Sequence, residues 1–394
     1  MSKMQSKMQS KIKILSVFGT RPEATKMAPL VKVLEGDARV ESIVCVTAQH
    51  RQMLDQVLDL FAIKPQFDLN IMLQNQDLAH ITTAALNGLM GVMRETSPDL
   101  LLVHGDTTTT MAAGLAAFYS GIRVGHVEAG LRSFDMQKPF PEEANRRIVS
   151  VLASLNFAPT QQAAANLLAE RVGGHDNPDN IYVTGNTAID AIDSLVSPEH
   201  TFNEEMLNKL DWSNRRFITV TAHRRENYGQ PMVNVCNAIK QLAADFDDVE
   251  FVWPVHLSPA VRNIVFDILG NNSKIHLLDP TDVADVLNVM ARSYMVMSDS
   301  GGIQEEAPHL NKPVLVLREV TERPEGLAAG CLRLAGTKLA DIYSHAAELL
   351  TNAEAHAQMA AAPNPFGDGK ASQRILQGIL HHFGMAERPP AFGE

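Results

Sequence analysis

The chain has 394 residues, of which 45% are hydrophobic and 20% are charged, and its formal net charge is −11. This length exceeds what one ordinary hydrophobic core needs, so it predicts two domains of about 150–200 residues each. The acidic balance argues against a general nucleic-acid partner, because surfaces that bind nucleic acids are usually basic.

The start of the chain, residues 1–12, is predicted to be a disordered leader. It repeats Ser-Lys-Met-Gln and lacks the apolar segment of a signal peptide. No apolar stretch reaches the ~18 residues that a membrane span needs. Cys45, Cys236 and Cys331 lie far apart, which favours a reducing cytoplasm over a disulfide framework. No histidine or cysteine cluster has the spacing of metal ligands, so no metal is expected.

Short β-branched strands alternate with helical stretches through the first half of the chain. The predicted strands are Ile12–Phe18, Ile43–Thr47, Leu100–His104, Ile122–Val127 and Leu155–Ala158. The predicted helices are Ala24–Leu34, Met53–Phe61, Ala79–Met93 and Thr109–Tyr119. Strands joined by crossover helices form a parallel sheet with both faces covered.

A second set of the same kind follows Trp212. Its predicted strands are Phe217–Ala222, Val249–Val255, Lys274–Leu278, Tyr294–Ser298 and Pro313–Leu317. Its predicted helices are Met232–Phe246, Pro259–Leu269 and Val283–Ala291. We therefore expect two doubly wound α/β domains, residues 13–180 and 181–365, with the joint between Asn180 and Asn214. In this architecture ligands bind outside the carboxyl ends of the strands.

Charged side chains follow several strand ends in the first domain. Arg21 and Lys26 come after the first strand, in a turn that lacks the G-x-G-x-x-G dinucleotide fingerprint. Asp106 and Glu128 follow neighbouring strands, and Glu142 follows a loop bounded by prolines. Carboxylates that share one rim raise one another's pKa, which suits acid and base catalysis. The adjacent Glu143 is expected only to favour a helix N-terminus.

The second domain contains a candidate phosphate site. Ser300, Gly301 and Gly302 follow a buried strand and open a helix whose first N–H groups lack a capping side chain, so an anion is favoured there. A carboxylate in the first turn of this helix suits a ribose diol. His223 and Arg224 follow another strand and suit a phosphate clamp. Arg323 lies on a later loop that is expected to converge on the glycine turn.

Eight segments that contain these features occur in the same order as in one protein family. They are Gly19–Glu23, Val103–Thr110, Gly125–Arg132, Pro141–Arg146, Thr184–Thr187, Thr221–Asn227, Asp299–Pro308 and Thr321–Gly326. Together they closely resemble the bacterial non-hydrolysing UDP-N-acetylglucosamine 2-epimerases, over essentially everything but the leader. The resemblance implies a GT-B fold of two Rossmann-like domains with the active site in the cleft between them. It also implies that a last helix, at about 370–384, packs back on the first domain.

The family reaction interconverts UDP-N-acetylglucosamine and UDP-N-acetylmannosamine without a cofactor. UDP is eliminated to give 2-acetamidoglucal and is then added back, with protonation on the other face. The resemblance assigns acid and base roles to Asp106, Glu128 and Glu142, supported by His223. It assigns substrate binding to Arg21, Lys26, Ser300, Gly301, Gly302, Glu306 and Arg323. The order in which the carboxylates act is left open.

The resemblance also implies a cytoplasmic homodimer that supplies precursors of surface polysaccharide. Some relatives bind a second substrate molecule as an activator, and the corresponding regulatory residues here are Gln49, His50, Gln76 and Arg224. The uracil contacts stay open, because Thr281 and Val286 depart from the residues that many relatives carry.

Four other functions are compatible with parts of this pattern. A GT-B glycosyltransferase would use the same nucleotide site, but it must also admit an acceptor. An epimerase of a related UDP sugar, such as a 2,3-diacetamido uronic acid, would share the chemistry, and so would an epimerase that hydrolyses the intermediate. A UDP-sugar sensor would have no need of three carboxylates.

Overall fold

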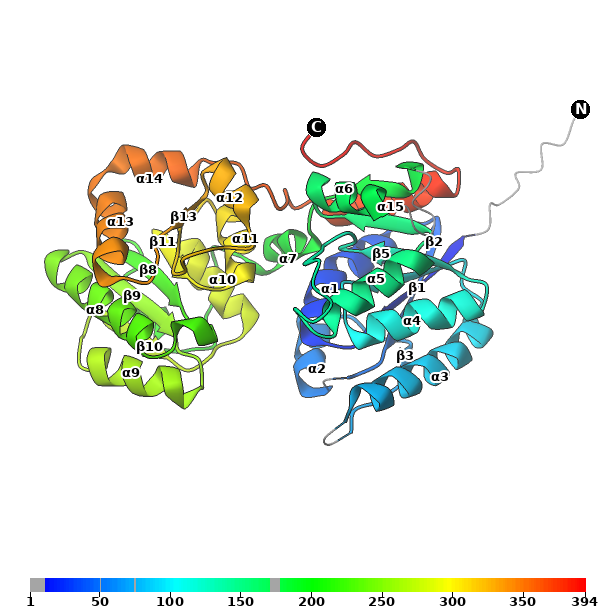
Figure 1. The fold of residues 1–394 in the computed structure, drawn as a ribbon, viewed down its shortest axis with the longest axis horizontal. Coiled ribbons are helices and arrows are strands. Elements are labelled where there is room, and N and C mark those ends of the chain that lie inside the picture. The colour runs from blue at the N-terminus through cyan, green and yellow to red at the C-terminus, as the bar shows by residue number, and fades with distance from the viewer. Residues whose placement is uncertain (1–10, 50, 74–75, 171–177) are drawn as a thin grey trace, which may run out of the picture. The chain divides into compact units, whose positions relative to one another are not determined.

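The computed structural model describes residues 11–49, 51–73, 76–170 and 178–394. The chain divides into two compact units, Met1–Ala191 with Gly367–Glu394, and Ile192–Phe366 (Figure 1). The first boundary falls inside helix α7 (Thr187–Leu195). Most of the predicted leader lies outside the described residues. In the part of the chain that is described, no helix has both the length and the apolar character of a membrane span.

The first unit is built on a parallel seven-stranded sheet. In sheet order its described strands are β3 (Phe67–Asp68), β2 (Val40–Val46), β1 (Ile12–Phe18), β4 (Leu100–His104), β5 (Arg123–Val127), β6 (Leu155–Ala158) and β7 (Ile181–Val183). The predicted strands are confirmed, with bounds that differ by a few residues at most. β3 and β7 were not predicted, because runs of two or three residues carry too little pattern.

Helices cover both faces of this sheet. α3 (Leu78–Thr96), α4 (Thr108–Tyr119) and α5 (Glu142–Leu152) pack in succession on one face, over a core that includes Leu15 and Leu101. α1 (Arg21–Gly36) packs on α2 (Arg51–Leu60) and on α15 (Ala371–His382). α6 (Gln161–Glu170) precedes β7. Ile14 and Phe18 alternate with Leu15 and are also fully buried, as expected for strands covered on both sides.

The second unit repeats the design with six parallel strands among the described residues. Their order is β10 (Ile275–Leu278), β9 (Val249–Pro254), β8 (Arg216–Thr221), β11 (Met295–Ser298), β12 (Val314–Val316) and β13 (Leu332–Leu334). One face carries α8 (Gln230–Asp245), α9 (Pro259–Leu269), α13 (Leu339–Thr351) and α14 (Ala353–Ala360) around the buried Trp253. The remaining helices are α10 (Val283–Arg292), α11 (Gly301–His309) and α12 (Pro324–Ala329).

The strand order reverses at one point in each sheet. The chain moves outward from β1 to β3 and then returns to pair β4 with β1, and β8 and β11 are related in the same way. Ligands of doubly wound sheets bind at such switch points, outside the carboxyl ends of the strands. The loops after β1, β4, β8 and β11 are therefore the places where each unit is expected to bind a ligand.

Candidate active site

A buried carboxylate ties together the two switch-point loops of the first unit. Glu23 accepts hydrogen bonds from the backbone N–H groups of Gly19 and Thr20 at 3.1 and 2.9 Å, and from the hydroxyls of Thr107 and Thr110 at 2.7 and 3.0 Å. Burial raises the pKa of Glu23, and these four hydrogen bonds oppose that shift. The loop after β1 is thus fastened to the loop after β4.

These loops line a pocket of about 440 Å³ that contains three of the predicted site residues, Arg21, Asp106 and Glu142. Asp106 forms an ion pair with Arg146, and its backbone carbonyl accepts a hydrogen bond from Asn145 Nδ2 at 2.9 Å. The Asp106 side chain keeps 26% of its surface exposed. Its carboxylate is therefore held in place while it stays open to a ligand.

Glu142 and Glu143 differ sharply although they are adjacent at the start of α5. Within the described structure, Glu142 Oε2 is buried and has no hydrogen-bond partner. Glu143 is fully buried and accepts from the Ser133 N–H, Arg146 and Arg147 at 2.9–3.0 Å. Burial raises the pKa of Glu143, but these donors outweigh it and the net pKa is lowered. Glu143 therefore has a structural role, while Glu142 presents an unsatisfied oxygen at a pocket.

Glu128 follows β5 directly and has an unusual backbone conformation. Its φ is +62°, in the left-handed region, which costs a residue other than glycine about 1–3 kcal/mol. Its carboxylate forms an ion pair with Lys26 and accepts a hydrogen bond from Asn186 Nδ2 at 3.3 Å. Strain of this kind persists where surrounding contacts impose it, and it is typical of functional sites.

Two buried histidines lie beside these carboxylates. His104 Nε2 is 3.9 Å from Glu128 Oε2, and His126 Nε2 is 2.7 Å from the carbonyl oxygen of Gly105. Burial lowers the pKa of each ring to about 4. Both rings are neutral at pH 7, so Lys26 rather than His104 supplies the positive charge beside Glu128.

In the second unit, two guanidinium groups lie beside the N-terminus of α11. Ser300 is its N-cap residue and makes no side-chain capping bond within the described structure. A Cβ atom added at Gly301 would lie 3.6 Å from Arg224 Nη2 and 3.7 Å from Arg323 Nη2. The first N–H groups of a helix, flanked by guanidinium groups, suit a phosphate or diphosphate.

Glu305 and Glu306 lie in the second turn of α11 rather than in the predicted first turn, because the helix begins at Gly301, and their carboxylates have different neighbours. Glu305 is buried and forms an ion pair with Arg323 at 2.5 Å. Glu306 is half-buried, and its Oε1 lies 3.4 Å from the position of a Cβ atom added at Gly302. Glu306 is therefore the carboxylate beside the glycine turn, and Glu305 orients Arg323. The ribose contact of Glu306 stays a prediction.

A smaller pocket of about 210 Å³ lies beside the same helix and is lined in part by His223, His256, Pro280 and Ser300. The rings of His223 and His256 stack with centroids 5.6 Å apart. Burial lowers the pKa of His223, as do His256 and Arg224, while Asp299 opposes the shift. Thr281 follows Pro280, and its hydroxyl is buried with no hydrogen-bond partner in the described structure.

Two of the predicted regulatory residues lie together in the first unit. Gln76 Nε2 donates to the backbone carbonyl of Gln49 at 2.9 Å, and Gln49 also lines the 440 Å³ pocket. His50 lies outside the described residues. Arg224 lies beside Gly301 in the second unit, where it suits phosphate binding.

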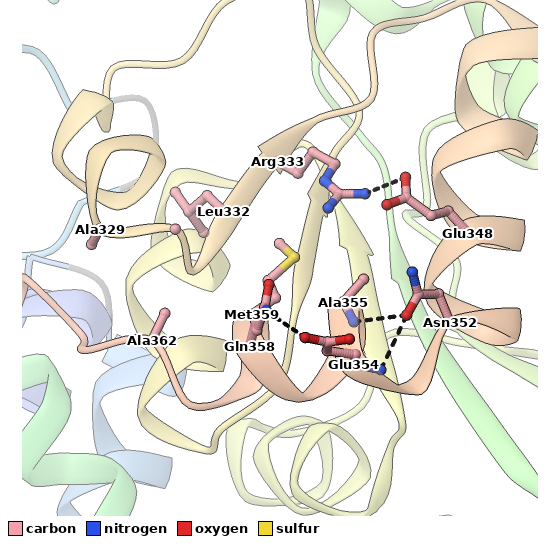
Figure 2. Close-up of a pocket in the computed structure, with 11 residues that line it drawn as sticks. Ala329, Leu332, Arg333, Glu348, Asn352, Glu354, Ala355, Gln358, Met359 and Ala362 are labelled. Carbon is pink, nitrogen blue, oxygen red and sulfur yellow. Dashed lines mark hydrogen bonds and ion pairs between the residues drawn. The ribbon is translucent and has the colours of Figure 1, made fainter.

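Another pocket of about 530 Å³ lies beside β13 in the second unit (Figure 2). Its charged side chains contact one another: Arg333 pairs with Glu348 at 2.9 Å, and Gln358 donates to Glu354 at 3.3 Å. The Asn352 side chain caps α14. Because β13 is the edge strand rather than a switch-point strand, this pocket is not a candidate active site.

Sequence reasoning missed three residues that support the site: Asn145, Asn186 and Asp299. Asn186 follows β7 and Asp299 follows β11, so the strand-end rule that found Asp106 also applied to them. Asn186 was missed because β7 has only three residues. Asp299 was not predicted, because the segment was interpreted only as a phosphate site formed by the neighbouring Ser300, Gly301 and Gly302.

Comparison with known proteins identifies the family. Residues 32–380 match the family model described as UDP-N-acetylglucosamine 2-epimerase. The chain is 51% identical to the Bacillus subtilis UDP-N-acetylglucosamine 2-epimerase over 380 residues, which cover 96% of this chain and 98% of that relative.

Solved structures extend the comparison to three dimensions. The Neisseria meningitidis UDP-GlcNAc 2-epimerase, solved with UDP-GlcNAc, is 46% identical with a TM-score of 0.80, over 94% of this chain and all of that one. The S. aureus MnaA structure with UDP is 48% identical with a TM-score of 0.83, over 97% of this chain and all of that one. The two units accordingly have the two-domain, Rossmann-like GT-B fold. These comparisons favour an epimerase over the transferase and sensor alternatives.

Proposed function

Because the chain belongs to the UDP-N-acetylglucosamine 2-epimerase family, we propose that it interconverts UDP-N-acetylglucosamine and UDP-N-acetylmannosamine by elimination and re-addition of UDP. The protein is an isomerase. Two sets of residues carry the proposal, each within its own unit. In the first unit, Asp106 and Glu142 line one pocket and Glu128 pairs with Lys26. In the second unit, Arg224 and Arg323 lie beside Gly301 at the N-terminus of α11.

The reaction needs both the carboxylates of the first unit and the phosphate site of the second. The proton on C2 of the sugar is not acidic, since no carbonyl is adjacent to that carbon. A carboxylate takes this proton while the C1–O bond breaks and UDP leaves with the bonding electrons, which gives a C1–C2 double bond. Re-addition of UDP and protonation of C2 from the other face give the epimer. Acid and base catalysis by a positioned group typically contributes about 10²–10⁴-fold.

The residues of the first unit act on the sugar in this proposal. Asp106, Glu128 and Glu142 exchange protons with it, and their order of action is not assigned. Lys26 stabilises the ionised form of Glu128 through their ion pair. Arg21 lines the pocket that Asp106 and Glu142 share, and it contributes positive charge there.

The residues of the second unit hold the nucleotide. Ser300, Gly301 and Gly302 bind the diphosphate through the N–H groups of α11, and Arg224 and Arg323 neutralise its charge. Glu306 binds the ribose hydroxyls, and His223 assists the departure of UDP. Both products of the elimination stay bound, so UDP remains available for re-addition.

Incubation with UDP-N-acetylglucosamine alone in D₂O tests the proposal. We expect UDP-N-acetylmannosamine to appear with deuterium at C2 in both epimers, with no added cofactor, as followed by NMR. If the protein incorporates no deuterium at C2 of the nucleotide sugar, the epimerase function is refuted. If free N-acetylmannosamine and UDP accumulate instead, the protein is a hydrolysing epimerase. The same assay with the 2,3-diacetamido uronic acid nucleotide tests substrate choice.

We also propose that the protein is a cytoplasmic homodimer that supplies precursors of surface polysaccharide. Exposed aromatic side chains support self-association, since Phe118 and Tyr119 at the end of α4 expose 60% and 62% of their surface. Light scattering coupled to size-exclusion chromatography measures the mass directly. A monomer at micromolar concentration would contradict the homodimer.

A further inference from the structure

Asp299 is a fully buried carboxylate that organises the loop after β8. Its Oδ2 atom accepts hydrogen bonds from the backbone N–H groups of His223 and Arg224 at 2.9 and 2.8 Å, and from Asn227 Nδ2 at 2.9 Å. Three donors therefore converge on one oxygen. This arrangement fixes both the position of the carboxylate and the start of the loop.

The other oxygen of Asp299 has a different environment. Oδ1 is buried and accepts no hydrogen bond from the residues that the structure describes. The Nδ1 atom of His223 lies 3.6 Å from it, which is longer than a hydrogen bond. A buried acceptor without a donor destabilises the folded state. A small rotation of the His223 ring, whose side chain is 42% exposed, removes that cost.

We propose that Asp299 positions His223 with its proton on Nδ1, and that His223 Nε2 takes up a second proton when a diphosphate binds beside Ser300. The ring is neutral in the free protein and faces a pocket that Ser300 also lines. Because Nδ1 and Nε2 lie on opposite edges of the ring, a donor bond from Nδ1 to Asp299 leaves Nε2 toward the ligand. This inference rests on the proposed function, since it gives His223 a role in holding the departing UDP.

The surrounding charges explain why the ring changes its protonation with the ligand. In the free protein, burial, the stacked His256 and the cationic Arg224 all lower the pKa of His223, and only Asp299 opposes them. A diphosphate adds negative charge on the side of Nε2 and favours the imidazolium. The proton comes from solvent on binding. The Nε2–H group then donates to the diphosphate as the C1–O bond breaks.

Nitrogen NMR of the free protein tests the first half of the proposal. With ¹⁵N-labelled histidine, we expect the His223 resonances to report a neutral ring protonated at Nδ1, assigned by their loss in His223→Gln. In Asp299→Asn, the amide oxygen can still accept the loop N–H groups, while the amide N–H₂ faces Nδ1. The ring should then carry its proton on Nε2. A wild-type ring protonated at Nε2 would overturn the inference.

Calorimetric titration of UDP tests the second half. Measured at pH 7.5 in two buffers with different ionisation enthalpies, binding to the wild type should take up protons. Asp299→Asn should lose most of this uptake and His223→Gln all of it. Wild-type binding without uptake, or equal uptake in His223→Gln, would refute the proposal. Should Asp299→Asn not fold, the wild-type tautomer and His223→Gln still decide it. Neither measurement needs turnover, so the outcome is separate from that of the epimerase assay.

Discussion

Asn186 Nδ2 donates a hydrogen bond to Glu128 Oε1 at 3.3 Å, so a side chain from the turn after β7 holds a carboxylate at the end of β5. The same oxygen accepts from Lys26, which lies in α1. One contact from the turn after β7 and one from α1 thus fix a carboxylate whose backbone is in the left-handed region. This arrangement compensates for the backbone strain and gives the carboxylate one orientation.

Replacing Asn186 tests whether this orientation matters. Asn186→Ala removes a hydrogen bond to a charged group, which is worth about 1.5–3 kcal/mol, and we expect kcat to fall about 10–100-fold. It also removes the bond that Asn186 Oδ1 accepts from the Ala188 N–H at 3.0 Å. The affinity for UDP should stay unchanged, because the proposed function assigns the nucleotide to the other unit. Asn234→Ala is the matched control, since its side chain also makes two bonds: it donates to the Thr337 carbonyl and accepts from Gln230 Nε2, both at 3.0 Å. Equal losses of kcat in both variants would contradict a specific role for Asn186.

The neighbours Glu142 and Glu143 offer a paired test of function against structure. Glu142→Gln removes an ionisable oxygen that has no hydrogen-bond partner in the described structure, so kcat should fall about 10²–10⁴-fold with little change in stability. Titration calorimetry should give a Kd for UDP within about threefold of the wild-type value.

Glu143→Gln should behave in the opposite way. It weakens bonds to Ser133, Arg146 and Arg147, so the free energy of unfolding should fall by about 1–3 kcal/mol. Urea unfolding measures this loss. If Glu142→Gln abolished UDP binding, or if both variants lost stability equally, Glu142 would be structural too.

Gly301 and Gly91 form a second matched pair, since both are helical glycines with room for a methyl group. A Cβ atom at Gly301 makes only ordinary contacts with Arg224 and Arg323, so Gly301→Ala should fold normally. The methyl group would nevertheless occupy the approach of the diphosphate. We expect the Kd for UDP to rise about tenfold, a change of about 1.4 kcal/mol.

Gly91→Ala provides the comparison. No atom lies within 4 Å of its added Cβ, and alanine in a helix interior is favoured over glycine by about 0.5–1 kcal/mol. The free energy of unfolding should rise and UDP affinity should not change. An unaltered Kd in Gly301→Ala would show that the diphosphate does not approach this glycine.

The sequence predicts the strand ends well, because short apolar runs that give way to small or polar residues mark them clearly. Asp106, Glu128 and the glycine turn at Gly301 were all found in this way. The partners of these residues could not be found, since Lys26 and Glu128 are 102 positions apart and meet only through the fold. The difference between Glu142 and Glu143 also depends on packing, because both occupy the first turn of the same helix.

His104 and His126 predict how the first unit responds to acid. Their pKa values are about 4 in the folded protein against 6.5 when unfolded, so between these values only the unfolded chain binds protons. The contribution of these two rings to the free energy of unfolding should therefore be constant above pH 6.5 and fall as the pH is lowered toward 4, by about 3 kcal/mol for each ring.

Urea unfolding followed by far-UV circular dichroism, from pH 4.5 to 7.5, measures how steeply the free energy of unfolding falls with pH. His104→Gln should make this fall less steep. Tryptophan fluorescence follows the second unit separately, because Trp212 and Trp253 both lie there, and its pH profile should not change in His104→Gln. Parallel pH profiles for wild type and His104→Gln would mean that the buried His104 ring does not contribute to the acid sensitivity.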